Sequence, residues 1–383
     1  VARPNGVGFQ VIDSFSRVVR LGEGLTESGR LSEAAMDRAV AALRICGERV
    51  AKHRNVTLRA IATEACRRAA NGADFADRVR RETGVRLEII TAEEEARLAV
   101  AGCAPLLDPL AEELVVFDIG GGSTEVMWVD LSGTHAERRR ALLMALARRA
   151  DEAGGAPTDV ADHIKDWISI PDGVVTLSDA FEPDEEDAEA ARGAPQAVPD
   201  CFHHMERHVS AQLSDFAKRN GPLSDDRLRR LQLLGTSGTI TTLAGVHLGL
   251  PRYTRDQVDG LWMRRAEVER VIERLRGLSP EGRRAIPCIG QDRAVNLMAG
   301  AAILQAVLNA WPTDRIRVAD RGLREGILYG LMQEEAEGGR GPSGGGGGGG
   351  GGGRRSRSHS RVGQSLLRGA ASGARPGSGE RGG

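Results

Sequence analysis

Three features that mark large classes of protein are scarce in this chain of 383 residues. No apolar run approaches the roughly 18 to 20 residues that cross a membrane, and we recognise no signal peptide at the start. Aromatic residues make up only 3% of the composition, which leaves few surfaces on which the bases of a single strand could stack. These absences argue against a membrane protein and against a general single-strand binder.

The five cysteines are too widely spaced to suggest a metal site. They are Cys46, Cys66, Cys103, Cys201 and Cys288. The sequence contains no CxxC and no Cys/His pair at the spacing of a zinc site. We therefore expect reduced and mostly buried thiols in a cytoplasmic protein.

The balance of charge differs between the body of the chain and its end. The whole chain has a net charge of −1, with 52 basic and 53 acidic residues. The segment 338–383 holds eight arginines and one acid, which leaves 44 basic against 52 acidic residues, or −8, for the body. An acidic body argues against broad nucleic-acid binding there.

Residues 336–383 have the composition of a disordered tail. Ten consecutive glycines, 344–353, precede the arginine-rich segment RRSRSHSR. Such a segment cannot bury enough apolar area to offset its chain entropy. We expect a solvated tail without a specific partner, and a weak contact of its arginines with a polyanion is the alternative.

Short apolar runs of strand length alternate with helical patterns along the body, which predicts an α/β fold. Strands are expected in VTLRAIAT, VRLEII, ELVVFDI, STEVMWVDL, RLQLLG and RIRVAD. The third and fourth of these adjoin through a glycine turn, so they are expected to form an antiparallel hairpin. The charged region 133–167 and the apolar stretch 292–311 are expected to be helical.

The segment VVFDIGGGSTEV, 115–126, combines an acid at a strand end with a glycine triplet and two hydroxyls. Consecutive amides in a tight turn form a nest that binds anions, and Asp118 is placed to hold Mg²⁺ directly or through water. No GK[ST] follows, so this is not a Walker loop. A tight hairpin with ordinary glycines is the alternative. The residues expected to bind phosphate here are Gly120, Gly121, Gly122, Ser123 and Thr124.

A second segment, LLGTSGTITTLAG, repeats this arrangement of a strand followed by small polar residues. It leads into a helix, whose first amides and positive dipole end favour phosphate. An ordinary helix cap has the same appearance, so both interpretations stay open for this segment alone. The candidate phosphate ligands are Thr236, Ser237, Gly238 and Thr239.

The acidic segment ITAEEEARLAVAG opens a helix. Thr91 and Glu94 have the spacing of a capping box, which explains Glu94 without any catalytic role. Glu95 lies three residues before Leu98, at the edge of the packed face, so its carboxylate could point into a cleft as a general base. Earlier in the chain, Arg67 follows a strand end and could reach phosphate oxygens, although a solvated basic face is the more common explanation.

Six segments occur in an order that resembles a known family. They are ATEACRRAANG, ITAEEEARLAVAG, FDIGGGSTEV, GVVTL, GTSGTITTLAG and ADRGLREGIL. Together, over about residues 9–331, they resemble the exopolyphosphatase and guanosine pentaphosphate phosphatase family. This family belongs to the superfamily of sugar kinases, actin and heat-shock chaperones.

The resemblance implies two RNase H-like domains that flank a cleft. We place the first at 1–113 plus 300–335 and the second at 114–299. The resemblance also implies Mg²⁺-dependent release of orthophosphate from polyphosphate or guanosine pentaphosphate, and it leaves a homodimer open. Its residue roles fall on Glu95 as the catalytic base, Asp118 and Glu125 as metal ligands, and Arg67 as a phosphate-facing arginine.

Two departures from the family pattern leave other functions open. The family's first phosphate loop, Asp-x-Gly-(Ser/Thr)-Asn, would be expected ahead of Val1, and Pro171-Asp172-Gly173 stands where the family usually has an apolar residue before the glycine. The alternatives are a catalytically silent protein that binds polyphosphate or nucleotide, and a kinase of the same superfamily that uses ATP. The residues do not decide between polyphosphate and guanosine pentaphosphate.

Overall fold

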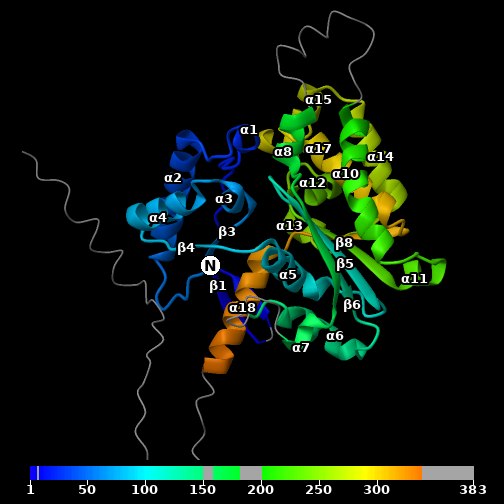
Figure 1. Ribbon diagram of the computed structural model, residues 1–383, viewed down its shortest axis with the longest axis horizontal. Helices are drawn as coiled ribbons and strands as arrows, with labels where there is room; N and C mark the ends of the chain where they lie inside the picture. The colour runs from blue at the N-terminus through cyan, green and yellow to red at the C-terminus, as the bar shows by residue number, and fades with distance from the viewer. Residues whose placement is uncertain (7, 150–157, 182–200, 339–383) are drawn as a thin grey trace, which may run out of the picture.

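The computed structural model describes residues 1–6, 8–149, 158–181 and 201–338. Its centre is a six-stranded mixed sheet in the order β7-β6-β5-β8-β10-β9 (Figure 1). The strands are β5 Glu113–Ile119, β6 Thr124–Asp130, β7 Ile164–Ile170, β8 Leu231–Thr236, β9 Trp262–Arg264 and β10 Arg315–Ala319. β5, β6 and β7 pair antiparallel, β5, β8 and β10 pair parallel, and β9 closes the edge antiparallel to β10.

Helices cover both faces of this sheet because its central strands are apolar on both sides. Along β5, Val115 and Phe117 face one core while Leu114 and Val116 face the other, as the alternation of a strand requires. The first face is covered by α8 Val174–Phe181, α10 Cys201–Arg219, α12 Gly238–His247, α14 Arg265–Arg276 and α17 Leu297–Ala310. The second is covered by α5 Ala92–Cys103, α6 Ala136–Ala145 and α18 Leu323–Gly338.

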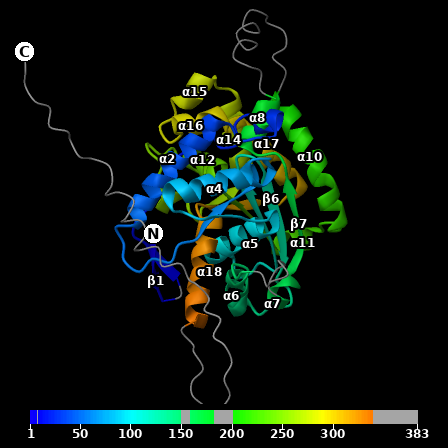
Figure 2. The ribbon, with the colours of Figure 1, turned by 60° about the vertical axis from the view of Figure 1, so that its left-hand side comes forward.

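A smaller unit stands beside the large sheet (Figures 1 and 2). Its two parallel strands are β3 Ala60–Ala62 and β4 Leu87–Ile89. Its helices are α1 Leu25–Ser28, α2 Glu33–Val50, α3 Glu64–Arg68 and α4 Gly72–Thr83. A separate apolar cluster around Phe75 and Val79 holds them together. The unit matters for the site because α3 carries Arg67.

The remaining elements are short connections and one hairpin. β1 Ala2–Asn5 and β2 Gly8–Val11 pair antiparallel. The short helices are the 3-10 turn Ala104–Leu106, α7 Thr158–Ala161, α11 Asp225–Arg230, α13 Arg255–Val258, α15 Pro280–Arg284 and α16 Gln291–Val295. No helix in the described part of the chain is long and apolar enough to cross a membrane.

Most of the expected elements are found, including the glycine hairpin of β5 and β6. The expectation that 133–167 is helical throughout is wrong at its end, because β7 begins at Ile164 and pairs with β6. Its charged residues mislead because Lys165 and Asp166 lie near the edge of the sheet, where they pair with Glu113 and Arg219. The proposed domain boundaries stay a prediction. The predicted disordered tail begins too early, because helix α18 continues to Gly338. Residues 339–383 lie outside the described residues.

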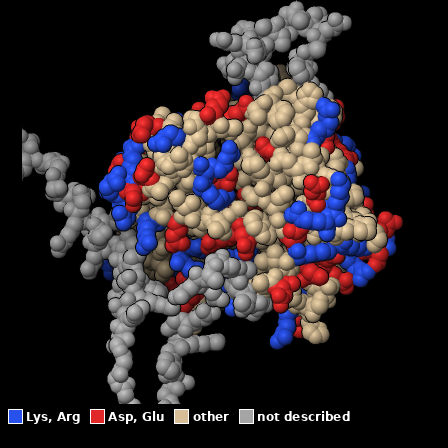
Figure 3. All heavy atoms as spheres, in the orientation of Figure 1, with Lys and Arg blue, Asp and Glu red and all other residues tan. Residues whose placement is uncertain are grey.

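Acidic and basic side chains are interspersed on the face of the molecule that Figure 3 presents. They do not gather there into a patch of one sign. The buried thiols Cys66, Cys103 and Cys288 agree with expectation.

Helices α5 and α18 approach each other through glycines. A Cβ added to Gly326 would lie 2.0 Å from the Leu98 carbonyl oxygen, and one added to Gly102 would lie 1.9 Å from the Gly322 carbonyl oxygen. Any other residue would force the two backbones apart. This close packing fixes the position of α5, and therefore of Glu95.

We predict that Gly326→Ala lowers the free energy of unfolding by about 3 kcal/mol, because the clash is with backbone that cannot turn away. Urea denaturation followed by circular dichroism measures the change. Gly133→Ala is the matched control, since its Cβ would meet nothing within 4 Å. A stability equal to that of the control would contradict the close approach.

Glu113 anchors the first residue of β5 to its surroundings. It accepts hydrogen bonds from Arg227 at 2.7 and 2.8 Å and from the Trp128 indole at 2.6 Å. Lys165 lies 3.6 Å away, and it and Arg227 both stack on the Trp128 ring. Burial raises the pKa of Glu113, but the hydrogen bonds from Arg227 and the charge of Lys165 outweigh burial and lower it.

Glu113→Gln should therefore reduce the free energy of unfolding by about 1 to 3 kcal/mol at pH 7. A lowered folded pKa stabilises the protein above pH 4.5, the ordinary glutamate value, and this contribution is lost as the pH falls through the folded pKa. The difference between the two proteins should shrink below pH 4.5 in urea titrations. A difference that stays constant down to pH 3 would refute this linkage.

Candidate active site

The site lies where β5, β8 and β10 end and β6 begins. Asp118 pairs in register with Glu125 on one side and with Thr236 on the other. Glu125 in turn pairs with Ser169 of β7. Side chains at paired positions point to the same face of a sheet, so this row faces the side on which α5 packs.

The two carboxylates of this row are held near each other in a poorly hydrated place. Burial raises the pKa of Glu125 to about 8, and the negative charges of Glu95 and Asp118 add to the effect. Burial also raises the pKa of Asp118 to about 6, and the positive charge of Arg324 opposes this shift. Burial is the largest cause of both shifts, and at Glu125 the neighbouring carboxylates add to it.

Glu95 joins this row from helix α5. The Thr91 hydroxyl accepts from the Glu94 amide at 3.1 Å and caps the start of the helix. The expected capping box is only half formed, because the Glu94 carboxylate accepts from Arg59 at 2.6 Å. Glu95 is only 8% exposed, and burial raises its pKa to about 7, with Arg67 opposing and Asp118 reinforcing the shift. A Glu95 carboxylate oxygen accepts a hydrogen bond from Arg67 at 3.2 Å.

The glycine turn is held by its neighbours and keeps two amides available. Gly120 donates its amide to the Ser123 carbonyl at 2.9 Å, and Gly121 accepts at its carbonyl from Val175 at 2.8 Å. Gly173 packs so closely that an added Cβ would lie 2.4 Å from Gly121 backbone. The amides of Gly121 and of Gly122 donate to no group in the described part of the chain.

The two hydroxyls after the glycine triplet, those of Ser123 and Thr124, donate hydrogen bonds within the protein. The Ser123 hydroxyl donates to Glu125 at 2.5 Å, and Ser169 donates to the same oxygen at 3.1 Å. The Thr124 hydroxyl donates to the carbonyl of Asp172 at 2.8 Å. In this structure both predicted phosphate donors, Ser123 and Thr124, are therefore engaged by the protein itself.

The second motif is also tied into the fold. The Thr236 hydroxyl donates to the Arg321 carbonyl, and the Ser237 hydroxyl donates to the Ile119 carbonyl, each at 2.5 Å. Ser237 has a φ of 82°, a conformation that costs a non-glycine residue about 1 to 3 kcal/mol and that clusters at functional sites. Gly238 begins α12, while Thr239 is buried against α17.

Three residues of the site escaped sequence reasoning. Ser169 could have been found only from the pairing of β7 with β6. Arg324 stands in ADRGLREGIL, where no neighbouring residue marks it as the cation that acts on Asp118. Glu64 precedes Arg67 by three residues, a helical spacing that brings the two side chains together.

Metal ligation by side chains alone is limited at this row. In residues 1–6, 8–149, 158–181 and 201–338, no three His, Cys, Asp or Glu side chains are arranged to hold one metal ion. Any cation bound here would draw further ligands from water or from a ligand's oxygens.

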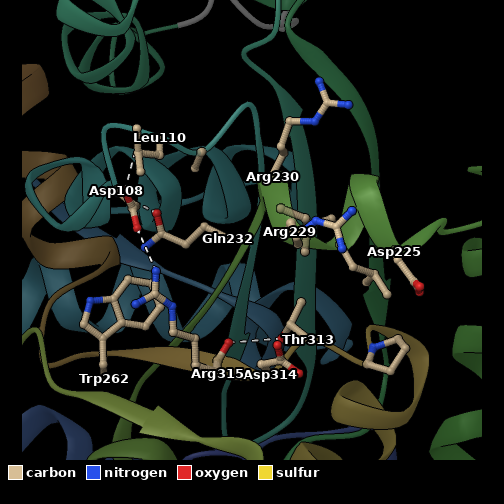
Figure 4. A pocket seen from close by; sticks show the side chains of 14 residues that line it. Asp108, Leu110, Asp225, Arg229, Arg230, Gln232, Trp262, Thr313, Asp314 and Arg315 are labelled. Atoms are coloured by element: carbon tan, nitrogen blue, oxygen red, sulfur yellow. Dashed lines mark hydrogen bonds and ion pairs between the residues drawn. The ribbon is translucent and has the colours of Figure 1, made fainter.

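A separate hollow of about 390 Å³ lies at the other end of the strands from the candidate site, beside the first residues of β8 and β10 (Figure 4). Its arginines are already paired, Arg315 with Asp108 at 3.1 Å and Arg230 with Glu112 at 2.9 Å. The Arg315 guanidinium also covers the Trp262 ring, 4.0 Å from its centroid. None of the predicted site residues lines it.

Comparison with known proteins decides the family. A family model described as the Ppx/GppA phosphatase family matches residues 1–335. The chain belongs to this family. The resemblance drawn from the six segments is thereby confirmed.

Individual proteins that are similar to this Ppx/GppA family member support the same assignment. Exopolyphosphatase 1 of Mycobacterium leprae (strain TN) is 25% identical over 334 residues, which cover 85% of this chain and 83% of the relative. The crystal structure of the Aquifex aeolicus family member is 26% identical, has a TM-score of 0.61, and is matched over 87% of this chain and 93% of that one.

An exopolyphosphatase structure from Cytophaga hutchinsonii supports the fold alone. It is 23% identical with a TM-score of 0.64, over 82% of this chain and 88% of that one. The predicted fold class, α/β with the actin-like architecture of RNase H-like domains, is confirmed by these structures.

The row of buried carboxylates makes a prediction about stability. Glu125→Gln should raise the melting temperature in buffer that contains a chelator at pH 8, by about 2 to 4 °C, because it removes one of three mutually repelling charges. The amide oxygen can still accept from Ser123 and Ser169. Calorimetry measures the shift, with Glu112→Gln as the control, because Glu112 is a half-exposed acid beside the same strand and pairs with Arg230 rather than with the row. A lower melting temperature would contradict the repulsion.

Proposed function

We propose that this chain hydrolyses phosphoanhydride bonds and releases orthophosphate from the end of inorganic polyphosphate, from guanosine pentaphosphate, or from both. One observation carries the proposal. The buried carboxylate of Glu95 faces Asp118 and Glu125 at the strand ends, beside a glycine turn with two available amides. Membership in a phosphatase family and a relative named exopolyphosphatase support it.

Glu95 is the general base in this proposal. One of its oxygens accepts from Arg67, which orients the carboxylate and leaves the other oxygen for a water molecule. The water oxygen bonds to the terminal phosphorus as the bridging P–O bond breaks, and the water proton passes to Glu95. A pKa near 7 suits a base that works at neutral pH.

The terminal phosphoryl binds between the two small-residue motifs. The amides of Gly121 and Gly122 receive its oxygens from one side, and the first turn of α12, which begins at Gly238, faces it with a positive dipole end from the other. Donors held in place before the reaction stabilise the charge that develops as the bond breaks. The hydroxyls of Ser123, Thr124, Thr236 and Ser237 keep these motifs in shape.

Asp118 and Glu125 would hold Mg²⁺. They fit it, because they are adjacent oxygen donors in an excess of negative charge, and because Mg²⁺ keeps several waters and needs only one or two protein carboxylates. When bound, the ion would neutralise charge on the leaving phosphate oxygens. A cytoplasmic location is also part of the proposal and follows from the reduced, buried thiols.

Glu95→Gln tests the base. Because the amide cannot accept the water proton, turnover of polyphosphate with Mg²⁺ should fall about 100- to 10,000-fold while substrate binding is kept. Orthophosphate release by the full chain, from tripolyphosphate and from guanosine pentaphosphate with no other nucleotide present, is the measurement. Glu93→Gln, two residues away and paired with Arg97, is the control.

Each outcome distinguishes a function. Unchanged turnover in Glu95→Gln would remove Glu95 from the mechanism. Binding of polyphosphate by the unaltered chain without any release would identify the silent binding protein. Consumption of ATP, with no phosphate release from tripolyphosphate or guanosine pentaphosphate, would identify the kinase.

A further inference from the structure

Arg67 is the arginine that should face phosphate, yet its donors are occupied within the chain. Its Nε and Nη2 both donate to one oxygen of Glu64, at 3.1 and 2.6 Å. Its Nη1 donates to the Ile90 carbonyl at 2.9 Å and to Glu95 at 3.2 Å. A guanidinium has five N–H groups, so a single one, on Nη2, is left over.

Two-point recognition of a phosphoryl group needs two parallel donors on one edge of the guanidinium. The contacts with Ile90 and Glu95 take up Nη1. The pair formed by Nε and Nη2 is the edge that matches phosphate, and Glu64 covers it. A phosphoryl group can therefore make a two-point contact with Arg67 only after Glu64 has left that edge.

Glu64 lies in the path of the expected phosphoryl group. It begins α3, and a Cβ added to Gly122 would lie 3.5 Å from its Cγ, so its side chain rests against the glycine turn. The side chain is 13% exposed, and Arg68 lies 3.7 Å from its second oxygen. An ordinary helical ion pair is solvated and contributes little, whereas this one is enclosed between Arg67 and the turn.

We propose that Glu64 determines specificity by occupying the phosphate position on Arg67 until a polyanionic substrate displaces it. The inference rests on the proposed function and deepens it. A chain of phosphates makes further contacts that compensate for moving Glu64, whereas orthophosphate alone does not. Glu64 therefore weakens the binding of the product more than that of the substrate and limits product inhibition.

The test compares Glu64→Gln with the unaltered full chain. Gln keeps the size of the side chain and one acceptor oxygen but loses the charge that competes with phosphate. We expect the inhibition constant of orthophosphate to fall about three- to tenfold, the KM for tripolyphosphate to fall by less, and the turnover rate to change less than twofold. Glu93→Gln removes an equal charge that does not touch Arg67 and should leave all three constants unchanged.

Calorimetry with orthophosphate in the presence of a chelator gives the second readout, because it requires no turnover. Glu64→Gln should bind orthophosphate about three- to tenfold more tightly, and the gain should vanish in the double variant with Arg67→Ala. If Glu64→Gln unfolds, Glu64→Ala serves in the same comparison and should shift binding in the same direction.

The outcomes separate this inference from the proposed function. Tighter orthophosphate binding in Glu64→Gln without phosphate release by any variant would uphold the role of Glu64 and reject the hydrolase. Release with equal or weaker orthophosphate binding in Glu64→Gln would overturn the role of Glu64 and keep the hydrolase. Turnover reduced by two orders of magnitude or more, with unchanged binding, would make Glu64 a catalytic group and overturn the inference as well.

Discussion

Repulsion among Glu95, Asp118 and Glu125 is the constraint around which the site is organised. Like charges in a poorly hydrated place destabilise a fold unless donors and cations face them. Here Ser123 and Ser169 donate to Glu125, and Arg67 donates to Glu95. The surrounding strands and helices hold these groups in place. Part of the free energy gained by packing therefore offsets the unfavourable free energy of bringing the three carboxylates together.

The fold meets this constraint with backbone contacts that leave little freedom. Glycines bring α18 against α5, and another glycine brings the start of α8 against the turn at Gly121. Side-chain packing alone would allow adjustments of a few tenths of an ångström in these contacts. Because backbone meets backbone in both places, helix α5 with Glu95 and the turn at Gly121 have little freedom to shift.

The residues that the structure brings together could be singled out from the sequence because their signals are local. A strand-end acid, a glycine triplet and a capped acidic helix each depend on residues close together in the chain, so Asp118, Gly121 and Glu95 could be chosen in advance. The sequence could not tell in which direction hydroxyls point. Thr124 was expected to bind phosphate, but its hydroxyl donates to Asp172, a partner 48 positions away.

Long-range strand pairing explains why the start of β7 and the place of Ser169 could not be predicted from the sequence. Residues 164–167, the first part of β7, were expected to be helical because their charges resemble those of a solvated helix, and only the pairing of β7 with β6 reveals a strand. Ser169 belongs to the site through the same pairing. Glu64 was not singled out for a different reason. An acid three residues before an arginine is common on the surface of a helix, and only the structure shows that the side chain of Glu64 lies against the glycine turn.

The register of β5 and β6 has a consequence for how the protein can change over time. Asp118 and Glu125 share a face only because seven residue pairs match in sequence from Glu113 with Asp130 to Ile119 with Thr124. An insertion or deletion of one residue in either strand would turn one carboxylate to the opposite face of the sheet. Single-residue changes of length in this hairpin are therefore incompatible with the row of carboxylates, whereas substitutions that keep its register are not.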